Sequence, residues 1–156
     1  MIKILFVCLG NICRSPLAEA IFQQKIEQNG LESQLSCDSA GTANYHVGEA
    51  PDPRTIEVAG NHQVPVHHFG QQFKKKHHEE FNYLIAMDQS NKRNMISEMG
   101  TDSDSLFLMR DFDPKGKGKD VPDPWYGEMD GFEDVYQILD CSTDELLAYI
   151  RQKHNL

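Results

Sequence analysis

The chain has 156 residues, of which 39% are hydrophobic, and it carries a formal net charge of −9. The length fits one domain over residues 1–156, and the negative charge argues against general nucleic-acid binding, which needs a positive surface. Because no apolar run approaches the ~20 residues of a membrane span, no secretory signal is seen and the four cysteines have no regular spacing, we expect a cytoplasmic protein without membrane contact.

The first predicted element is a buried strand over residues 2–7, which delivers Cys8 into a short loop. Five residues separate Cys8 from Arg14, which is enough for the backbone to wrap around a tetrahedral anion with its N–H groups pointing inward. Gly10 and Asn11 tolerate the positive φ that we expect in so tight a wrap. The pattern predicts an anion-binding loop after the first strand.

A helix is expected to begin at Pro16, and its N-terminus adds unpaired N–H groups and the positive end of the helix dipole. Arg14 supplies a planar guanidinium that can bind two oxygens of a phosphate at once. These positive surroundings should lower the pKa of Cys8 well below the ~8.5 of a free thiol, leaving a thiolate nucleophile at neutral pH. A C-x5-R spacing alone is weak evidence, but its place between a strand and a helix makes it strong.

The predicted helix keeps its apolar periodicity up to Asn29-Gly30, which is a typical C-terminal stop. Residues 35–41 predict a second strand, and strand, helix, strand in this order indicates a parallel sheet. A Gly/Pro-rich loop over residues 43–55 carries Tyr45, Asp52 and Arg54. A short helix is predicted over residues 55–60.

A lysine run over residues 74–76 and the histidine pairs 67–68 and 77–78 raise the question of a metal or nucleic-acid site. Adjacent residues point apart on a helix and to opposite faces of a strand, so neither pair makes a natural two-ligand set. We interpret most of these side chains as solvated or locally hydrogen-bonded.

The second half of the chain predicts a strand over residues 81–87, a helix over 89–99, a strand over 105–109, a polar loop over 109–123 and a long amphipathic C-terminal helix. The expected fold class is therefore α/β, with a four-stranded parallel sheet flanked by helices on both faces. Its ligand site belongs beyond the carboxyl ends of the strands, where Cys8 is placed.

Asp123 is the candidate for an acid, because a thiolate that attacks phosphorus must expel an oxygen whose free phenol has a pKa near ~10. Pro122 and Pro124 stiffen Asp123, and Trp125-Tyr126 follow it as aromatic surfaces for a phenyl ring. An isolated Asp-Pro is usually only a turn, so this assignment depends on the longer segment around it.

The loop and its flanks resemble the signature of the low-molecular-weight protein tyrosine phosphatases, here Val7-Cys8-Leu9-Gly10-Asn11-Ile12-Cys13-Arg14-Ser15-Pro16. Further segments of this family recur as Asp38-Ser39-Ala40-Gly41-Thr42, Pro51-Asp52-Pro53-Arg54, Met87-Asp88-Gln89-Ser90-Asn91 and Pro122-Asp123-Pro124-Trp125-Tyr126-Gly127. The resemblance covers nearly the whole chain.

The resemblance implies Cys8 as nucleophile, Arg14 as phosphate ligand and Asp123 as general acid and base. It further implies a phosphate-binding loop made of Leu9, Gly10, Asn11, Ile12, Cys13, Arg14 and Ser15, a supporting network of Asn11, Ser15, Ser39 and His68, and cleft walls formed by Ile12, Tyr45, Trp125 and Tyr126. Cys13 is expected to act as a redox partner of Cys8. The family often has an arginine where this chain has Gln71, so the contact of that arginine is not expected here.

The expected activity is hydrolysis of phosphotyrosine in proteins, and of small aryl phosphates, through a phosphocysteine intermediate. The resemblance implies no cofactor or metal, inhibition by inorganic phosphate and other oxyanions, and a monomer or weak dimer. Three alternatives stay open. An arsenate reductase of this fold needs a close downstream cysteine pair, whereas only Cys37 and Cys141 remain here; a protein-arginine phosphatase tends to have threonine in place of Ile12; and an inactive phosphate-binding adaptor would not need all of the reactive residues.

Overall fold

Four parallel strands form the central sheet of the computed structural model, which describes residues 1–156. The strand order is β2-β1-β3-β4, with bounds β1 (Ile2–Cys8), β2 (Leu35–Gly41), β3 (Tyr83–Ala86) and β4 (Leu106–Leu108). In the register, Cys8 pairs with Gly41 and Val7 pairs with Ala86. Since the carboxyl ends of parallel strands meet at one edge of the sheet, the end of β1 lies where α/β folds bind their ligands.

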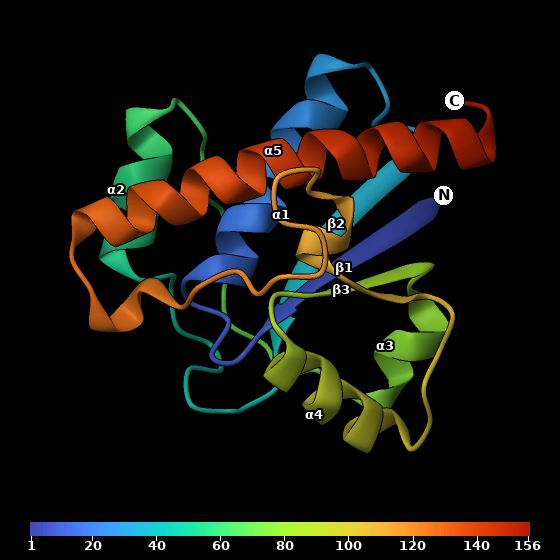
Figure 1. Cartoon of the computed structure of the whole chain (residues 1–156), viewed down its shortest axis with the longest axis horizontal. Coiled ribbons are helices and arrows are strands. Elements are labelled where there is room, and N and C mark those ends of the chain that lie inside the picture. Colours follow the sequence, from blue (N-terminus) through green and yellow to red (C-terminus); the bar gives the residue numbers. More distant parts are fainter.

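Helices cover both faces of the sheet. One face carries α1 (Arg14–Gln28), α2 (Pro53–Asn61) and α5 (Met129–His154), and the other carries α3 (Lys75–Glu80) and α4 (Gln89–Met99). Figure 1 shows α5, in red, running across α1 and α2, with α3 and α4 on the opposite side. No helix combines the length and the apolar character that crossing a membrane requires.

The side chains of β1 alternate between two cores, as the pleat of a strand dictates. Ile4, Phe6 and Cys8 point into the larger core beneath α1 and α5, while Leu5 and Val7 point into the smaller core beneath α4. Both sides of β1 are thus covered, which explains its nearly continuous apolar sequence. The predicted fold class is confirmed.

The start of α1 differs from the prediction. The helix begins at Arg14, which makes Pro16 its third residue and not its first. A proline is tolerated there because the N–H groups of the first turn have no intrahelical acceptor. As a result, Arg14 itself is held by helical backbone.

Other element bounds also needed correction. The helix predicted over residues 55–60 begins at Pro53, because the Asp52 carboxylate caps it by accepting a hydrogen bond from Arg54 N at 2.8 Å. The strands β3 and β4 are shorter than predicted, and the polar loop after β4 starts with the 3₁₀ turn η1 (Met109–Phe112). A second 3₁₀ turn, η2 (Pro124–Tyr126), follows Asp123.

The sequence did not predict α3, whose residues are all charged or polar. His77 is its buried side chain, with its ring 5.6 Å from Phe73 and 6.0 Å from Phe81 between ring centroids. Its Nδ1 accepts a hydrogen bond from Lys74 N at 2.8 Å, and burial lowers the pKa of His77. His77 is therefore locally hydrogen-bonded, but it is a neutral core residue and not a solvated one.

Candidate active site

Three carbonyl groups at the end of β1 and in the loop before α1 accept hydrogen bonds from other segments. Cys8 O accepts from Thr42 N at 2.9 Å, Leu9 O accepts from Ala43 N at 3.0 Å, and the carbonyl of Ile12 accepts a further backbone N–H at 2.8 Å. By contrast, the backbone N–H groups of residues 9–13 find no acceptor within the protein. A run of unpaired N–H groups on a helix N-terminus is a binding site for an anion.

Only one of the two residues expected at positive φ has it. Asn11 adopts φ 57°, in the left-handed region, whereas Gly10 does not. A Cβ at Gly10 would lie 3.2 Å from Cδ2 of His46, a tight contact that a small shift of the His46 side chain would relieve.

The side chain of Asn11 is fully hydrogen-bonded, which fixes this left-handed residue. Its Oδ1 accepts from Gln71 N at 3.0 Å and lies 2.6 Å from Nε2 of His68. Its Nδ2 donates to Ser15 Oγ at 2.8 Å and to Ser39 Oγ at 3.0 Å. The structure thus brings the four members of the predicted network together, and Gln71 joins them through its backbone.

Cys8 and Arg14 are both nearly inaccessible, each 3% exposed. Cys8 Sγ lies 3.0 Å from Ser15 Oγ, within hydrogen-bonding distance. Arg14 Nη1 donates to Asp88 Oδ2 at 2.7 Å and to the carbonyl of Val121 at 2.9 Å. Burial on its own would lower the pKa of Arg14, but the negative charges of Cys8 and Asp88 raise it above its usual value, so the guanidinium stays charged.

Asp88 is a site residue that the sequence reasoning missed. It lies two residues after the end of β3, and its Oδ1 caps α4 by accepting from Asn91 N at 2.7 Å. The available signal was its position: both Asp88 and Cys8 stand at the carboxyl ends of neighbouring strands.

Asp123 places a second carboxylate near Arg14. Its Oδ1 accepts a hydrogen bond from Trp125 N at 3.1 Å, while Oδ2 lies 3.7 Å from Nη2 of Arg14. The side chain is one-third exposed. One carboxylate oxygen is therefore held by the backbone, and the other faces the guanidinium at the edge of the solvent.

Arg54 fastens the segment after Asp123 to α2, a role that the sequence did not reveal. Its guanidinium binds both oxygens of Asp52, at 3.0 and 2.9 Å, and these hydrogen bonds lower the pKa of Asp52. Nη1 donates to the carbonyls of Trp125 at 3.3 Å and Gly127 at 3.2 Å. Since Asp52 N also donates to Ile12 O at 2.8 Å, the loop after β1 and the segment after Asp123 share one support.

These residues enclose a pocket of about 190 Å³. Its lining consists of the loop residues Cys8, Leu9, Gly10, Ile12, Cys13 and Arg14 together with Tyr45, His46, Asp123, Trp125 and Tyr126. Ile12 is buried, whereas Tyr45, Trp125 and Tyr126 are exposed around the mouth. His46 was not predicted; its Nδ1 lies 2.6 Å from Glu49 Oε2.

Cys13 lines the same pocket and is also buried. Burial, reinforced by the negative charges of Asp52 and Cys8, raises the pKa of Cys13 to about 12. At neutral pH this thiol is protonated. Of the two loop cysteines, only Cys8 lies within hydrogen-bonding distance of Ser15 Oγ.

Comparison with known proteins identifies the family. Residues 3–156 match the family described as low molecular weight phosphotyrosine protein phosphatase. The low molecular weight phosphotyrosine protein phosphatase of Schizosaccharomyces pombe is 42% identical over 149 residues, covering 93% of this chain and 95% of the relative. Among solved structures, YfkJ from Bacillus subtilis is 36% identical with a TM-score of 0.92, covering 98% of this chain and 96% of its own. The drosophila arginine phosphatase DARP is 27% identical with a TM-score of 0.87, covering 96% of this chain and 98% of its own. The chain therefore belongs to the low-molecular-weight protein tyrosine phosphatase family.

Proposed function

We propose that this phosphatase hydrolyses phosphotyrosine through a phosphocysteine on Cys8, with Arg14 binding the phosphate and Asp123 as general acid and base. The observation that carries the proposal is the run of unpaired N–H groups over residues 9–13, directly after Cys8, with Cys8, Arg14 and Asp123 lining one pocket. In this arrangement the general acid, the nucleophile and the anion-binding loop all contact the same phosphate group.

In the first step, the Cys8 thiolate attacks phosphorus in line with the tyrosine oxygen. The N–H groups of the loop and the Arg14 guanidinium stabilise the charge on the equatorial oxygens. Protonated Asp123 gives its proton to the leaving phenolate oxygen, a contribution of ~10²–10⁴-fold in this kind of catalysis. The products are a phosphocysteine and the dephosphorylated tyrosine side chain of the substrate.

In the second step, Asp123, now a carboxylate, removes a proton from the water that attacks phosphorus. The phosphorus–sulfur bond breaks and inorganic phosphate leaves. Ser15 assists because its hydroxyl, 3.0 Å from Cys8 Sγ, can donate to the departing thiolate. None of these steps uses a metal ion.

Tyrosine is favoured over arginine as the phosphorylated residue by the walls of the pocket. Ile12 presents an apolar side chain beside the anion site, and Trp125 and Tyr45 add aromatic surface, which suits a phenyl ring. A guanidinium substrate would call for polar groups at this depth.

The test compares turnover of phosphotyrosine, phosphoserine and phosphoarginine peptides of one sequence by the parent protein and by Cys8→Ser. We expect hydrolysis of the phosphotyrosine peptide alone, its loss in Cys8→Ser, and retention of phosphate binding by that variant. Substantial hydrolysis by folded Cys8→Ser would contradict the role of Cys8, and preferential hydrolysis of phosphoarginine would contradict the substrate.

A further inference from the structure

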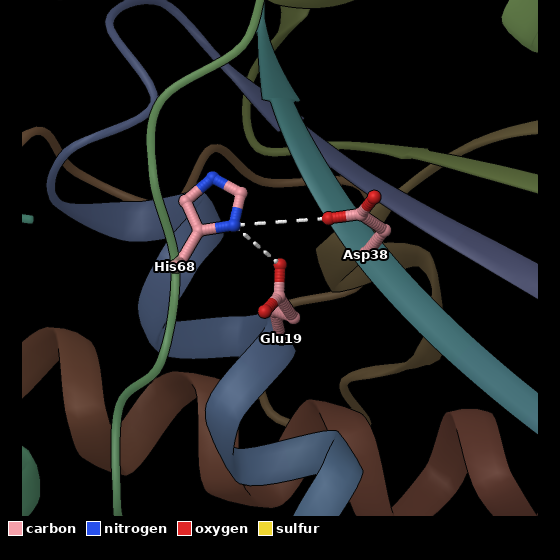
Figure 2. A group of neighbouring side chains, drawn as sticks. All are labelled: Glu19, Asp38 and His68. Carbon is pink, nitrogen blue, oxygen red and sulfur yellow. Dashed lines mark ion pairs between the residues drawn. The ribbon is translucent and has the colours of Figure 1, made fainter. Parts of the chain in front are cut away.

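Three side chains gather at one point outside the active-site pocket. Glu19 on α1, Asp38 on β2 and His68 direct one donor atom each toward one another, all within 4.8 Å. Figure 2 shows Nδ1 of His68 facing both carboxylates, at 3.1 Å from Glu19 Oε1 and 3.7 Å from Asp38 Oδ1. The proposed phosphatase chemistry makes no use of this cluster as a ligand site.

The orientation of the His68 ring follows from its neighbours. Gln71 N is a donor only, so the Asn11 atom that it meets at 3.0 Å is the amide oxygen. His68 Nε2 faces the same oxygen at 2.6 Å and must therefore carry its hydrogen. Nδ1 is left facing two carboxylate oxygens, and this contact is attractive only with a proton or a metal cation between them.

The charges of the cluster do not balance. Both carboxylates make their ion pairs with His68, and neither pairs with a lysine or an arginine. Gln71 gives Asp38 only a neutral hydrogen bond, from Nε2 to Oδ2 at 3.0 Å. Even with a fully protonated imidazole, one negative charge is in surplus here, which favours a cation of higher charge.

Each of the three side chains already has a hydrogen bond that fixes its orientation. Ser39 Oγ donates to Glu19 Oε1 at 2.8 Å, and Ser39 N donates to Asp38 Oδ1 at 2.8 Å. His68 is held by its Nε2–H on a side-chain carbonyl, as metal-binding histidines are. Access is open as well, because a cavity of about 500 Å³ is lined by Glu19, Asp38 and His68.

We propose that Glu19, Asp38 and His68 bind a divalent transition-metal cation, with Zn²⁺ as the best fit to one imidazole and two carboxylates. The cation takes the lone pair of Nδ1, any proton there leaves to solvent, and a water fills the fourth position. Ligand distances of about 2.0–2.2 Å require the donors to close up, and Asp38, the most exposed of the three, can move toward the other two. The Nε2–H bond to Asn11 is kept, so the bound cation braces the phosphate loop from outside the pocket.

The test is titration of Zn²⁺ into Cys8→Ser protein by calorimetry, since this variant lacks the pocket thiol most able to bind zinc. We expect one Zn²⁺ per chain and a raised melting temperature. Asp38→Asn and Glu19→Gln should each weaken binding at least ~10-fold. Glu133→Gln is the matched control, because it removes the carboxylate of another histidine pair, His62–Glu133 at 2.6 Å, and should leave zinc affinity unchanged.

Circular dichroism checks that each variant is folded, and anomalous scattering at the zinc edge locates the ion in crystals. The proposal is overturned if Zn²⁺ does not bind at millimolar concentration, if both folded variants bind it as tightly as Cys8→Ser alone, or if the anomalous peak lies elsewhere. Such a result leaves the proposed phosphatase chemistry untouched, because that chemistry is tested through peptide turnover.

Discussion

Asp88 both binds Arg14 and caps α4, and two different substitutions of Asp88 test these roles separately. Its Oδ2 binds Arg14 at 2.7 Å and its Oδ1 caps α4 through Asn91 N at 2.7 Å. Asp88→Asn keeps a good N-cap and a neutral acceptor for the guanidinium, whereas Asp88→Ala removes both. The two variants therefore distinguish the cap from the charge.

The structure sets the expected magnitudes. Asp88→Ala breaks a largely buried ion pair, with side chains 3% and 18% exposed, which should lower the free energy of unfolding by about 3–5 kcal/mol, and loss of the cap adds about 1 kcal/mol. Asp88→Asn loses only the ionic part of one hydrogen bond, about 1–2 kcal/mol. In both variants Arg14 retains Val121 O but can rotate, and a misplacement of about 1 Å costs about 100-fold in kcat/KM.

Urea unfolding measures the stabilities, and hydrolysis of p-nitrophenyl phosphate measures kcat/KM. The rise in melting temperature with added phosphate should be smaller in both variants, because a displaced Arg14 binds the anion less tightly. Equal stability of Asp88→Asn and Asp88→Ala would refute the capping role. Parental kcat/KM in both would refute the view that Asp88 orients Arg14.

Three further predictions concern the pocket. Arg14→Lys should reduce kcat/KM nearly as much as loss of the nucleophile, since an ammonium cannot bind two oxygens in one plane; steady-state rates near the parental value would contradict this. Asp123→Asn should slow phenyl phosphates in proportion to the pKa of their phenol, and a uniform loss across a leaving-group series would make Asp123 structural. Mild peroxide should inactivate the protein through a Cys8–Cys13 disulfide that mass spectrometry detects and that reductants reverse. After the same treatment, Cys13→Ser should recover little activity. Full recovery of Cys13→Ser would show that Cys13 serves only in packing.

A pH prediction follows from the Cys13 thiol, whose pKa is raised by burial from 9.0 to about 12. A raised folded-state pKa means that the unfolded chain loses the proton first, so the contribution of this thiol to stability is complete below pH 9 and declines from pH 9 to 12. Cys13→Ala lacks this decline. Urea unfolding at pH 8 and pH 10.5 should therefore show the stability gap between parent and Cys13→Ala narrowing at the higher pH, and a constant gap would contradict the assignment.

The first strand, the loop and the existence of α1, though not its first residue, could be predicted from the sequence because their determinants are local. An apolar run, a tolerant Asn11, and a helix whose first turn admits Pro16 all act within a few residues. Asp123 could be proposed for the same reason, since its prolines and aromatics are adjacent in the chain, and it lines the pocket. The ranges of β2 and α4 also agree with the prediction.

What the sequence could not reveal are contacts between distant segments. The ion pair of Arg14 with Asp88 spans 74 positions, and the hydrogen bond of Arg54 to Trp125 O spans 71. No periodicity or spacing encodes such a pairing. The short helix α3 was not predicted for a related reason. It is held by His77, which packs between two aromatic rings, and it has no apolar face of its own.

The residues that line the pocket differ widely in exposure. Cys8 and Arg14 are 3% exposed, whereas Tyr45 is 71% and Tyr126 is 88% exposed. Exchanging an exposed side chain usually changes the free energy of unfolding by less than about 0.5 kcal/mol. The exposed aromatic residues around the pocket can therefore be replaced without disturbing the fold or the buried residues Cys8 and Arg14. Substitutions at these exposed positions can therefore change which peptides the protein binds. Libraries that vary only positions 45, 125 and 126 should yield altered peptide preference with little loss of folded protein.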